Sequence, residues 1–295
     1  MDRRTFIATG LAWLGCGGCA LRPGELTVGS KNFTEQLILG EILKQSLESA
    51  CHVPVDGRFY LAGSYICQQA ILAGRIDTYV EYTGTAMAAI LKQQVSGGAA
   101  NVYDYVKQEY RRRFHLEVMR SLGFDNSFAM VMRPEDSRRL GLTTLSQLAP
   151  VAGQLRLGVG YEFLERQDGY PGLVRTYGLH FAEAPRVMDL GLLYRALENK
   201  SVDIVAGNNT DGLIAALGLV VLRDDKHYFP PYDAVPIVRP ELFTKCPQAR
   251  TALESLAGRI TADRMRAMNY AVDGQKKDAA DVAREFLNIK SPAQA

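Results

Sequence analysis

The stretch Gly74–Thr85 reads GRIDTYVEYTGT, and the rest of the chain can be arranged around it. Gly74 ends a helix, the residues from Ile76 to Val80 alternate as in a short strand, and EYTGT turns into a helix that begins near Ala86. A polar loop with an aromatic ring therefore lies at the carboxyl end of a strand. Open α/β sheets bind small ligands at this place, because the next helix directs unpaired N–H groups and the positive end of its dipole toward it.

A second unit of the same kind occurs at Glu198–Gly212, ENKSVDIVAGNNTDG. It again runs from a helix end through a strand, Val202–Val205, into a polar loop, with Thr210 just before the next helix. Two such units predict two α/β lobes that face each other across a cleft.

The order of the remaining elements predicts which segments of the chain belong to each lobe. Strands at 26–28 and 53–60, each followed by a helix, are typical of a parallel sheet. Phe128–Met132 is expected to cross into the second lobe, and the prolines before Tyr232 suit the return, because proline cannot donate to a sheet ladder. Amphipathic helices in 247–287 are expected to pack on the first lobe. We therefore assign 25–126 and 233–295 to lobe 1 and 127–232 to lobe 2, with two chain crossovers.

Two helix starts are predicted from the spacing of a capping box. Asn32 is followed three residues later by Glu35, and Thr144 by Gln147, each before apolar residues at helical spacing. We expect the side chains of Glu35 and Gln147 to cap their helices.

The first 20 residues are interpreted as an export signal rather than as part of the fold. Arg3 and Arg4 precede the apolar run Phe6–Leu14, which is shorter than the about 20 residues that span a bilayer. The segment resembles a twin-arginine signal. A cysteine at its end, Cys16 or Cys19, is a candidate for lipid attachment. We expect an exported protein, periplasmic or lipid-anchored to the cell envelope.

Three further cysteines, Cys51, Cys67 and Cys246, fall in the folded part. An odd number predicts no disulfide framework, although one pair could form in an oxidising compartment. We expect small buried hydrophobic side chains.

Composition and missing motifs exclude several classes of function. A chain of 295 residues that is 47% hydrophobic can form two globular domains, and a formal charge of +2 with scattered basic residues argues against a nucleic-acid partner. The sequence contains no HExxH, no GxSxG and no Walker loop, and its histidines lack metal-ligand spacing. We expect no metal, no cofactor and no enzymatic activity.

Aromatic rings, cations and hydroxyl groups gather at the predicted cleft. They suit a ligand with a cation at one end and an anion at the other. A quaternary ammonium group has no N–H to donate and is held by the faces of aromatic rings. A carboxylate at the far end would bind Arg166 in bidentate geometry. The residues at the cleft are Lys31, Tyr82, Thr85, Phe128, Tyr161, Arg166 and Tyr232.

Five motifs in order along the chain resemble the extracytoplasmic binding proteins of ABC importers for glycine betaine, choline and related quaternary amines. The resemblance covers essentially the whole mature chain. It implies a two-lobe periplasmic-binding-protein fold of type II that closes on a ligand in the interdomain cleft. It also implies a membrane permease and its ATPase as partners. We expect a monomer, because one chain closing on one solute needs no partner subunit. The motifs are GSKNFTEQ at 29–36, EYTGT at 81–85, RQDGY at 166–170, TDG at 210–212 and FPPY at 229–232.

Carried over residue by residue, the resemblance assigns roles in the site. Tyr82 and Tyr232 match two tyrosines of an aromatic cage. Lys31, Thr85 and Arg166 match the groups that hold a carboxylate.

Three other positions complete the expected site. The backbone near Asn126 is expected to line the cage. Phe128 stands where the family usually has tyrosine, which keeps the ring face and removes a hydroxyl. Asn208 stands where the family often has an aromatic residue, so one wall of the cage is replaced by an amide.

Two alternatives stay open. An exported enzyme could use Glu162, Glu165 or Asp168 as acid or base, although these carboxylates are more simply interpreted as caps and solvated charge. A binding protein for another polar solute, such as an amino acid, would use Asn208 and Asn209 as hydrogen-bonding groups.

Overall fold

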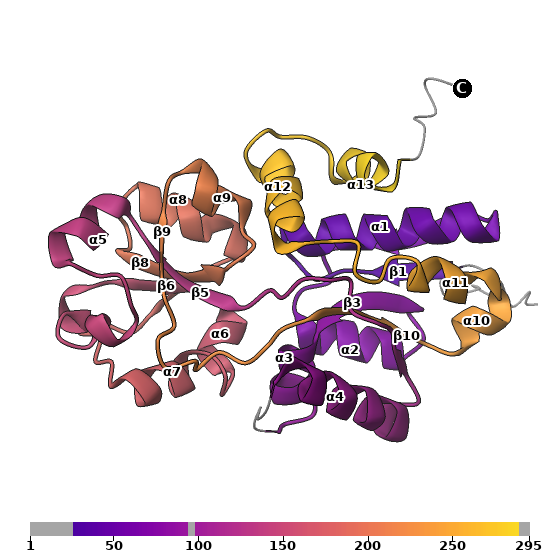
Figure 1. Cartoon of the computed structure of the whole chain (residues 1–295), viewed down its shortest axis with the longest axis horizontal. Helices are drawn as coiled ribbons and strands as arrows, with labels where there is room; N and C mark the ends of the chain where they lie inside the picture. Colours follow the sequence, from indigo (N-terminus) through magenta and orange to yellow (C-terminus); the bar gives the residue numbers. More distant parts are fainter. Residues whose placement is uncertain (1–25, 94–97, 289–295) are drawn as a thin grey trace, which may run out of the picture.

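The computed structural model describes residues 26–93 and 98–288 of the chain. These residues form two lobes, each a five-stranded sheet with helices on both faces (Figure 1). The predicted two-lobe α/β class is confirmed. The export signal and the candidate lipidation sites Cys16 and Cys19 lie outside the described residues. Within the described part, no helix is both long enough and apolar enough to cross a bilayer.

The sheet of the first lobe has the strand order β2-β1-β3-β10-β4. Strand β1 runs parallel to β2 and β3, whereas β10 lies antiparallel between β3 and β4. All five residues of β3, the strand predicted from GRIDTYVEYTGT, are buried, because helices cover both faces of the sheet. The strands are β1 Leu26–Gly29, β2 Val55–Arg58, β3 Thr78–Tyr82, β4 Glu117–Val118 and β10 Ala234–Val238.

The sheet of the second lobe has the strand order β7-β6-β8-β5-β9. Strand β6 is parallel to β7 and β8, and β5 is antiparallel to β8 and β9. The carboxyl ends of β6 and β8 therefore lie at the same edge as the beginning of β5. The strands are β5 Phe128–Met132, β6 Leu157–Val159, β7 Arg186–Val187, β8 Ile204–Asn208 and β9 Val220–Leu222.

The chain passes between the lobes twice, once between β4 and β5 and once between β9 and β10, as predicted (Figure 1). The two crossing segments lie side by side. Asn126 N–H donates to the Tyr232 carbonyl at 3.0 Å, and Asp125 bridges to Asp233. The lobe boundaries at 126 and 233 fall within this paired region, and their exact positions stay a prediction.

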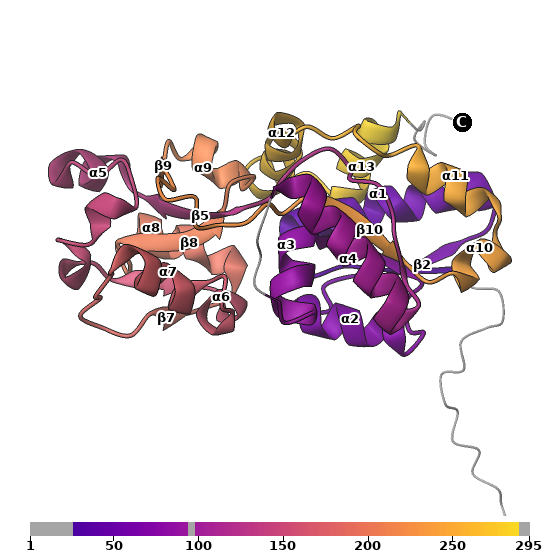
Figure 2. The same ribbon diagram turned by 60° about the horizontal axis from the view of Figure 1, so that its bottom comes forward.

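The helices of the first lobe include the amphipathic C-terminal helices. Helix α1 contacts α11, α12 and α13, which confirms that the C-terminal segment packs on this lobe. The turned view in Figure 2 shows α12 at the border between the lobes, where it contacts α9 of the second lobe. The helices are α1 Thr34–Cys51, α2 Ser64–Leu72, α3 Thr83–Thr85, the π-helical turn Ala86–Ile90, α4 Ala99–Phe114, α10 Glu241–Lys245, α11 Gln248–Glu254, α12 Ala262–Asp273 and α13 Ala279–Leu287.

The second lobe has shorter helices, and one predicted helix is missing from it. The segment after Thr144 forms only a 3₁₀ turn, Ser146–Leu148. Gln147 Oε1 accepts the N–H groups of Thr143 and Thr144 and closes a tight turn instead of capping a helix. The helices are α5 Pro134–Leu140, α6 Tyr161–Glu165, α7 Tyr170–Tyr177, α8 Leu193–Glu198 and α9 Gly212–Ala216, with 3₁₀ turns at Ala152–Gln154 and Leu190–Leu192.

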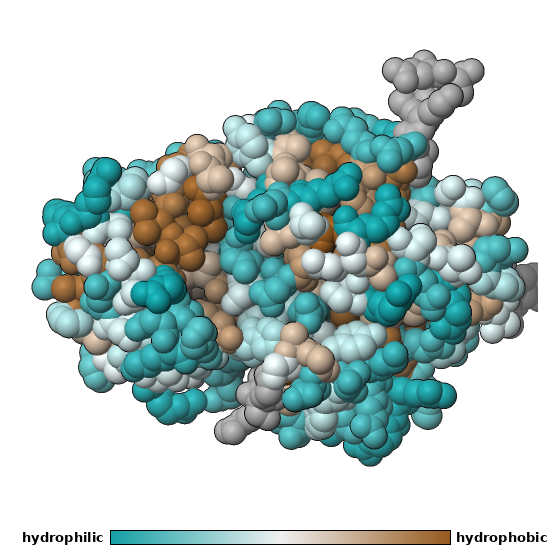
Figure 3. Space-filling view, viewed as in Figure 1, coloured by the Kyte–Doolittle hydropathy of each residue, from teal (hydrophilic) through white to brown (hydrophobic). Residues whose placement is uncertain are grey.

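Four apolar clusters, one on each face of each sheet, form the core. The cluster beneath α8 and α9 is covered by these two short helices and by Met188, Leu190 and Leu219. Leu213, Ile214 and Leu217 are only partly buried, and Figure 3 shows an apolar patch on this side of the second lobe.

Cys51 and Cys246 form a disulfide, contrary to the expectation of unbonded cysteines. Cys51 ends α1, and Cys246 follows α10, so the bond joins segments that are 195 residues apart in sequence. Cys67 is a buried free cysteine, as expected. The spacing of the cysteines could not reveal this pairing, because the sheet topology alone brings the two segments together.

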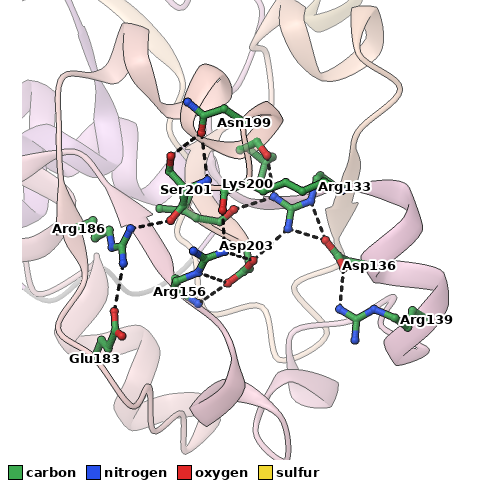
Figure 4. A network of polar contacts seen from close by, with 12 residues as sticks. Arg133, Asp136, Arg139, Arg156, Glu183, Arg186, Asn199, Lys200, Ser201 and Asp203 are labelled. Carbon is green, nitrogen blue, oxygen red and sulfur yellow. Dashed lines mark hydrogen bonds and ion pairs between the residues drawn. The ribbon is translucent and has the colours of Figure 1, made fainter.

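A network of charged side chains joins the strands of the second sheet at the end that is remote from the first lobe (Figure 4). Asp203, just before β8, accepts hydrogen bonds from the N–H and the guanidinium of Arg156, which precedes β6. Arg133, just after β5, donates to Asp203 at 3.0 Å and to the Leu197 and Val202 carbonyls at 2.7 Å. Hydrogen bonds from Arg156 hold the pKa of Asp203 well below its ordinary value despite partial burial.

Candidate functional site

A cavity of about 290 Å³ lies between the lobes. Both lobes and both crossing segments contribute to its wall. All eight residues predicted from the sequence line it, and so does Tyr161. Their positions are Lys31 after β1, Tyr82 at the end of β3, Thr85 in α3, Asn126 in the first crossing, Phe128 at the start of β5, Arg166 after α6, Asn208 at the end of β8 and Tyr232 in the second crossing.

Aromatic rings form much of this wall. The rings of Phe128 and Tyr232 meet edge to face at 5.6 Å, and Phe128 meets Phe163 in the same way at 4.8 Å. Phe33 stacks on Tyr82 at 6.4 Å from the other side of the cavity. Sequence reasoning did not select Phe33 or Phe163, although Phe33 lies two residues after Lys31 and Phe163, in α6, lies two residues after Tyr161.

Lys31 is paired within the protein. Its Nζ donates to Glu81, a carboxylate on β3 that is fully buried, and lies 4.6 Å from the centroid of the Tyr82 ring. Glu81 also accepts the N–H of Tyr82 at 2.8 Å. The lysine charge is therefore balanced before any ligand enters.

Arg166 is paired in the same manner. Its Nε and Nη2 both donate to Asp168, so the bidentate geometry predicted for a ligand carboxylate is taken by a protein carboxylate. Tyr232 Oη donates to the same carboxylate at 2.7 Å. The interpretation of Asp168 as solvated charge is wrong, since it is 8% exposed. Burial would lower the pKa of Arg166, but the adjacent Asp168 outweighs it and raises that pKa above its usual range.

The guanidinium of Arg166 lies 5.1 Å from the centroid of the Phe128 ring and 5.9 Å from that of Tyr232. This places a cation against the rings that were predicted to surround a ligand cation. Both distances are within about 6 Å, the range in which the face of a ring stabilises positive charge.

Glu35 lies behind this wall and connects the lobes. Its carboxylate accepts hydrogen bonds from Tyr82 Oη at 2.6 Å, Asn126 Nδ2 at 2.8 Å, Thr210 Oγ1 at 2.6 Å and Asn269 Nδ2 at 3.1 Å. Burial raises the pKa of Glu35 to about 7, although the hydrogen bonds, led by that of Thr210, oppose the rise.

The capping box predicted at Glu35 is therefore wrong. Helix α1 begins at Thr34 with Phe33 as its N-cap, and neither Asn32 nor Glu35 caps it. The carboxylate points into the interior, where Thr210 and Asn269 meet it from distant parts of the sequence. A short-range pattern could not reveal these partners.

Glu162 makes a second contact between the lobes, at the cavity wall. Its Oε1 accepts the N–H of Ser64, the first residue of α2, at 2.7 Å. A carboxylate on the second lobe thus meets the positive end of a helix of the first lobe. This carboxylate had been expected to act as a local cap or as solvated charge, whereas the helix it meets belongs to the opposite lobe.

Asn126 and Asn208 supply amide groups at the wall. Asn126 is buried, and its Oδ1 has no hydrogen-bond partner within the described residues. Asn208 is half-buried, and its N–H donates to Asp211 at 2.8 Å. Across 26–93 and 98–288, no group of three or more His, Cys, Asp or Glu side chains is arranged to hold a metal ion.

The chain is similar to known proteins in family, sequence and structure. A family model described as the substrate binding domain of ABC-type glycine betaine transport systems matches residues 24–288. The carnitine transport binding protein OpuCC of Listeria monocytogenes is 33% identical over 275 residues, which cover 92% of this chain and 88% of that protein.

The ergothioneine transport permease/ergothioneine binding protein EgtU of Helicobacter pylori is 34% identical over 269 residues. The match covers 91% of this chain and 48% of EgtU, so this chain spans about half the length of that relative. A crystal structure titled glycine betaine/carnitine/choline ABC transporter superimposes with a TM-score of 0.73 at 32% identity, covering 90% of this chain and 98% of the other.

Proposed function

Because this chain belongs to the family of substrate binding domains of ABC-type glycine betaine transport systems, we propose that it captures a quaternary ammonium solute and delivers it to a membrane permease. The observation that carries the ligand class is the set of rings from both lobes around one cavity: Tyr82, Phe128, Phe163 and Tyr232. A quaternary ammonium group cannot donate a hydrogen bond. Ring faces can stabilise it by up to about 2 kcal/mol each once water is excluded.

In this proposal Tyr82, Phe128 and Tyr232 surround the ammonium group. The polar end of the ligand meets Asn126 and Asn208, together with Lys31, Thr85 and Arg166. Glycine betaine, choline, carnitine and ergothioneine are the candidates, the last two taken from the names of the relatives.

Closure of the lobes couples capture to delivery. Glu35 with Thr210, and Glu162 with Ser64, are contacts between lobes that separate when the cleft opens. A ligand that bridges the lobes stabilises the closed form, whose surface differs from that of the open form. The permease then distinguishes loaded from empty protein by this surface.

The protein is proposed to act outside the cytoplasm as a monomer, together with a permease and its ATPase. The disulfide between Cys51 and Cys246 supports an oxidising compartment. Metabolic labelling with a radioactive fatty acid tests the anchor. Label that is lost from Cys16→Ala or from Cys19→Ala identifies the attachment site, and unlabelled wild type contradicts lipidation.

Isothermal titration with the four candidate solutes tests the ligand class. Tyr82→Ala and Tyr232→Ala are expected to abolish binding, whereas Tyr60→Ala, at a ring that is 55% exposed and outside the cavity wall, is expected to bind as wild type does. Circular dichroism verifies that each variant is folded. Absence of heat for all four solutes with folded wild type would reject the proposed ligand class.

We propose no catalytic step. Asp168 is committed to Arg166, and Glu162 accepts the Ser64 N–H, so neither is poised to move a proton. A bound solute recovered after long incubation is expected to have an unchanged mass. A mass change that depends on Glu162, Glu165 or Asp168 would favour an enzyme.

A further inference from the structure

The wall of the cavity carries more unpaired negative charge than unpaired positive charge. Among the described residues that line it, the cations are Lys31 and Arg166, and each is paired with its own buried carboxylate, Glu81 and Asp168. These two pairs cancel. What remains on the wall is acidic, because Glu162 and Asp189 also line the cavity.

Of these two carboxylates, Glu162 is the better placed to oppose the binding of a ligand carboxylate. Its Oε1 accepts the first N–H of α2, a nine-residue helix whose N-terminus could otherwise offer this donor to a ligand carboxylate. Its other oxygen lies 3.9 Å from Arg166 Nη1, the guanidinium nitrogen that Asp168 leaves unbonded. One protein carboxylate therefore stands beside two groups that could otherwise attract a ligand carboxylate, the Ser64 N–H and Arg166 Nη1.

The backbone opposite Glu162 is adapted to this contact. Gly63 precedes Ser64, and a Cβ at position 63 would lie 2.1 Å from Glu162 Oε1. Any larger residue would displace the carboxylate. The close approach of the two lobes at this point therefore depends on a glycine in one and a glutamate in the other.

We propose that Glu162 determines the charge class of the ligand, so that the cavity selects a quaternary ammonium cation without a carboxylate, such as choline, over zwitterionic betaines. The inference rests on the proposed function and narrows it. A cation entering the closed cavity neutralises an acidic wall. A zwitterion brings a further carboxylate next to that of Glu162, and it must displace Glu162 to reach the Ser64 N–H.

The test compares choline with glycine betaine by isothermal titration at one ionic strength. Wild type is expected to bind choline at least about tenfold more tightly, a modest effect for one charge at an effective dielectric constant of about 20. Glu162→Gln keeps an acceptor for the Ser64 N–H and removes the charge, so the preference is expected to shrink by about tenfold. Gly63→Ala, which displaces the carboxylate, is expected to shrink it as well.

Glu165→Gln is the matched control, because Glu165 lies on the same short helix and is exposed. It is expected to leave the preference unchanged. If wild type binds both solutes equally, or prefers glycine betaine, the inference is overturned while the proposed function stands. An undiminished choline preference in folded Glu162→Gln also overturns it. If neither solute binds to wild type, the inference is overturned, and the proposed function fails with it only when carnitine and ergothioneine do not bind either.

Discussion

Glu35 is a buried carboxylate with four hydrogen-bond donors and, within the described residues, no ion pair. An ionised carboxylate is costly in such a place unless its acceptor capacity is filled. Tyr82, Asn126, Thr210 and Asn269 fill it, and they come from the first lobe, a crossing segment, the second lobe and α12. One side chain therefore joins the ring wall of the cavity to the contact between lobes.

Replacing Glu35 with glutamine is expected to change how stability depends on pH. The pKa of Glu35 is about 7 when folded against 4.5 ordinarily, so the folded protein holds a proton that the unfolded chain releases. Wild-type stability relative to the variant should then fall as the pH rises from about 4.5 to about 7, by up to about 3 kcal/mol, and level off above. Urea titrations across pH 4–8 measure it.

Glu165→Gln, at an exposed carboxylate, serves as the control for this series. Its curve should run parallel to that of wild type. Parallel curves for Glu35→Gln between pH 4.5 and 7 would contradict a buried carboxyl with a raised pKa.

For single residues, the sequence predicted which side chains line the cavity better than it predicted their hydrogen-bond partners. Tyr82 and Tyr232 could be placed because each lies in a recognisable motif, and Phe128 because it begins a predicted strand. Glu35 could not, since Thr210 and Asn269 lie 175 and 234 residues away from it in sequence. The pairing of Arg166 with Asp168 was missed although the two are close in sequence, because nothing local indicates that both side chains are buried.

Among the elements, α1 is held at both ends. Its first turn carries Glu35, and its last residue, Cys51, is bonded to Cys246 beyond α10. Along its length it packs on α11, α12 and α13. The helix that positions Glu35 is thereby fixed independently of the cavity.

Breaking the disulfide is expected to lower stability without altering affinity. A closed loop of 195 residues contributes up to about 5 kcal/mol through the entropy of the unfolded chain. Reduction, or the pair Cys51→Ser with Cys246→Ser, should lower the melting temperature by roughly 5–15 °C. Neither cysteine lines the cavity, so the ligand Kd should persist below the transition. A reductant should have no effect on the double variant, and an equal melting temperature for oxidised and reduced wild type would contradict the prediction.

Strands were predicted more securely than short helices. The strands predicted at 26–28, 53–60, 76–80, 128–132 and 202–205 all form within a few residues, because buried apolar runs have few alternatives. The helix expected after Thr144 does not form, since Pro150 limits its length and Gln147 bonds backward to Thr143 and Thr144. A capping-box spacing is also compatible with a tight turn, and sequence alone does not separate the two.

At the scale of the whole molecule, the residues that stabilise the second sheet and those that line the cavity lie at opposite ends of its strands. Its β6 and β8 run from the charged network around Asp203 to the cavity, with Gly160 and Asn208 at the far end. The two ends share strands but no side-chain contacts in the structure described here.

Asp203→Asn is expected to destabilise the second lobe by about 1–3 kcal/mol, because Arg156 and Arg133 lose a charged acceptor. The pKa of Asp203 is depressed, so its contribution is present above the ordinary pKa of 3.8 and is lost as the pH falls below it. The gap between wild type and variant should therefore narrow in acid. Ligand affinity at neutral pH should stay unchanged. A higher Kd in the folded variant would contradict the claim that the network around Asp203 affects stability and not binding.

The two lobes are joined by a hydrogen bond that an opening of the cleft would break. Thr210 Oγ1, on the second lobe, donates to Glu35 Oε2, and the Thr210 carbonyl accepts Asn269 Nδ2 at 2.8 Å. Thr210→Val keeps the shape and the carbonyl but leaves the Glu35 carboxylate short of one donor. A hydrogen bond to a charged group contributes about 1.5–3 kcal/mol, so the ligand Kd should rise by roughly 10- to 100-fold, mainly through faster dissociation.

Thr176→Val, at an exposed threonine on α7, is the control and should bind as wild type does. Small-angle scattering adds a readout that a purely local effect would not move: with saturating ligand, Thr210→Val should retain a larger share of open molecules and a larger radius of gyration. An unchanged Kd together with an unchanged radius would show that closure does not depend on this bond. Because the permease is proposed to recognise the closed surface, the same variant should also deliver solute more slowly at equal occupancy of the cavity.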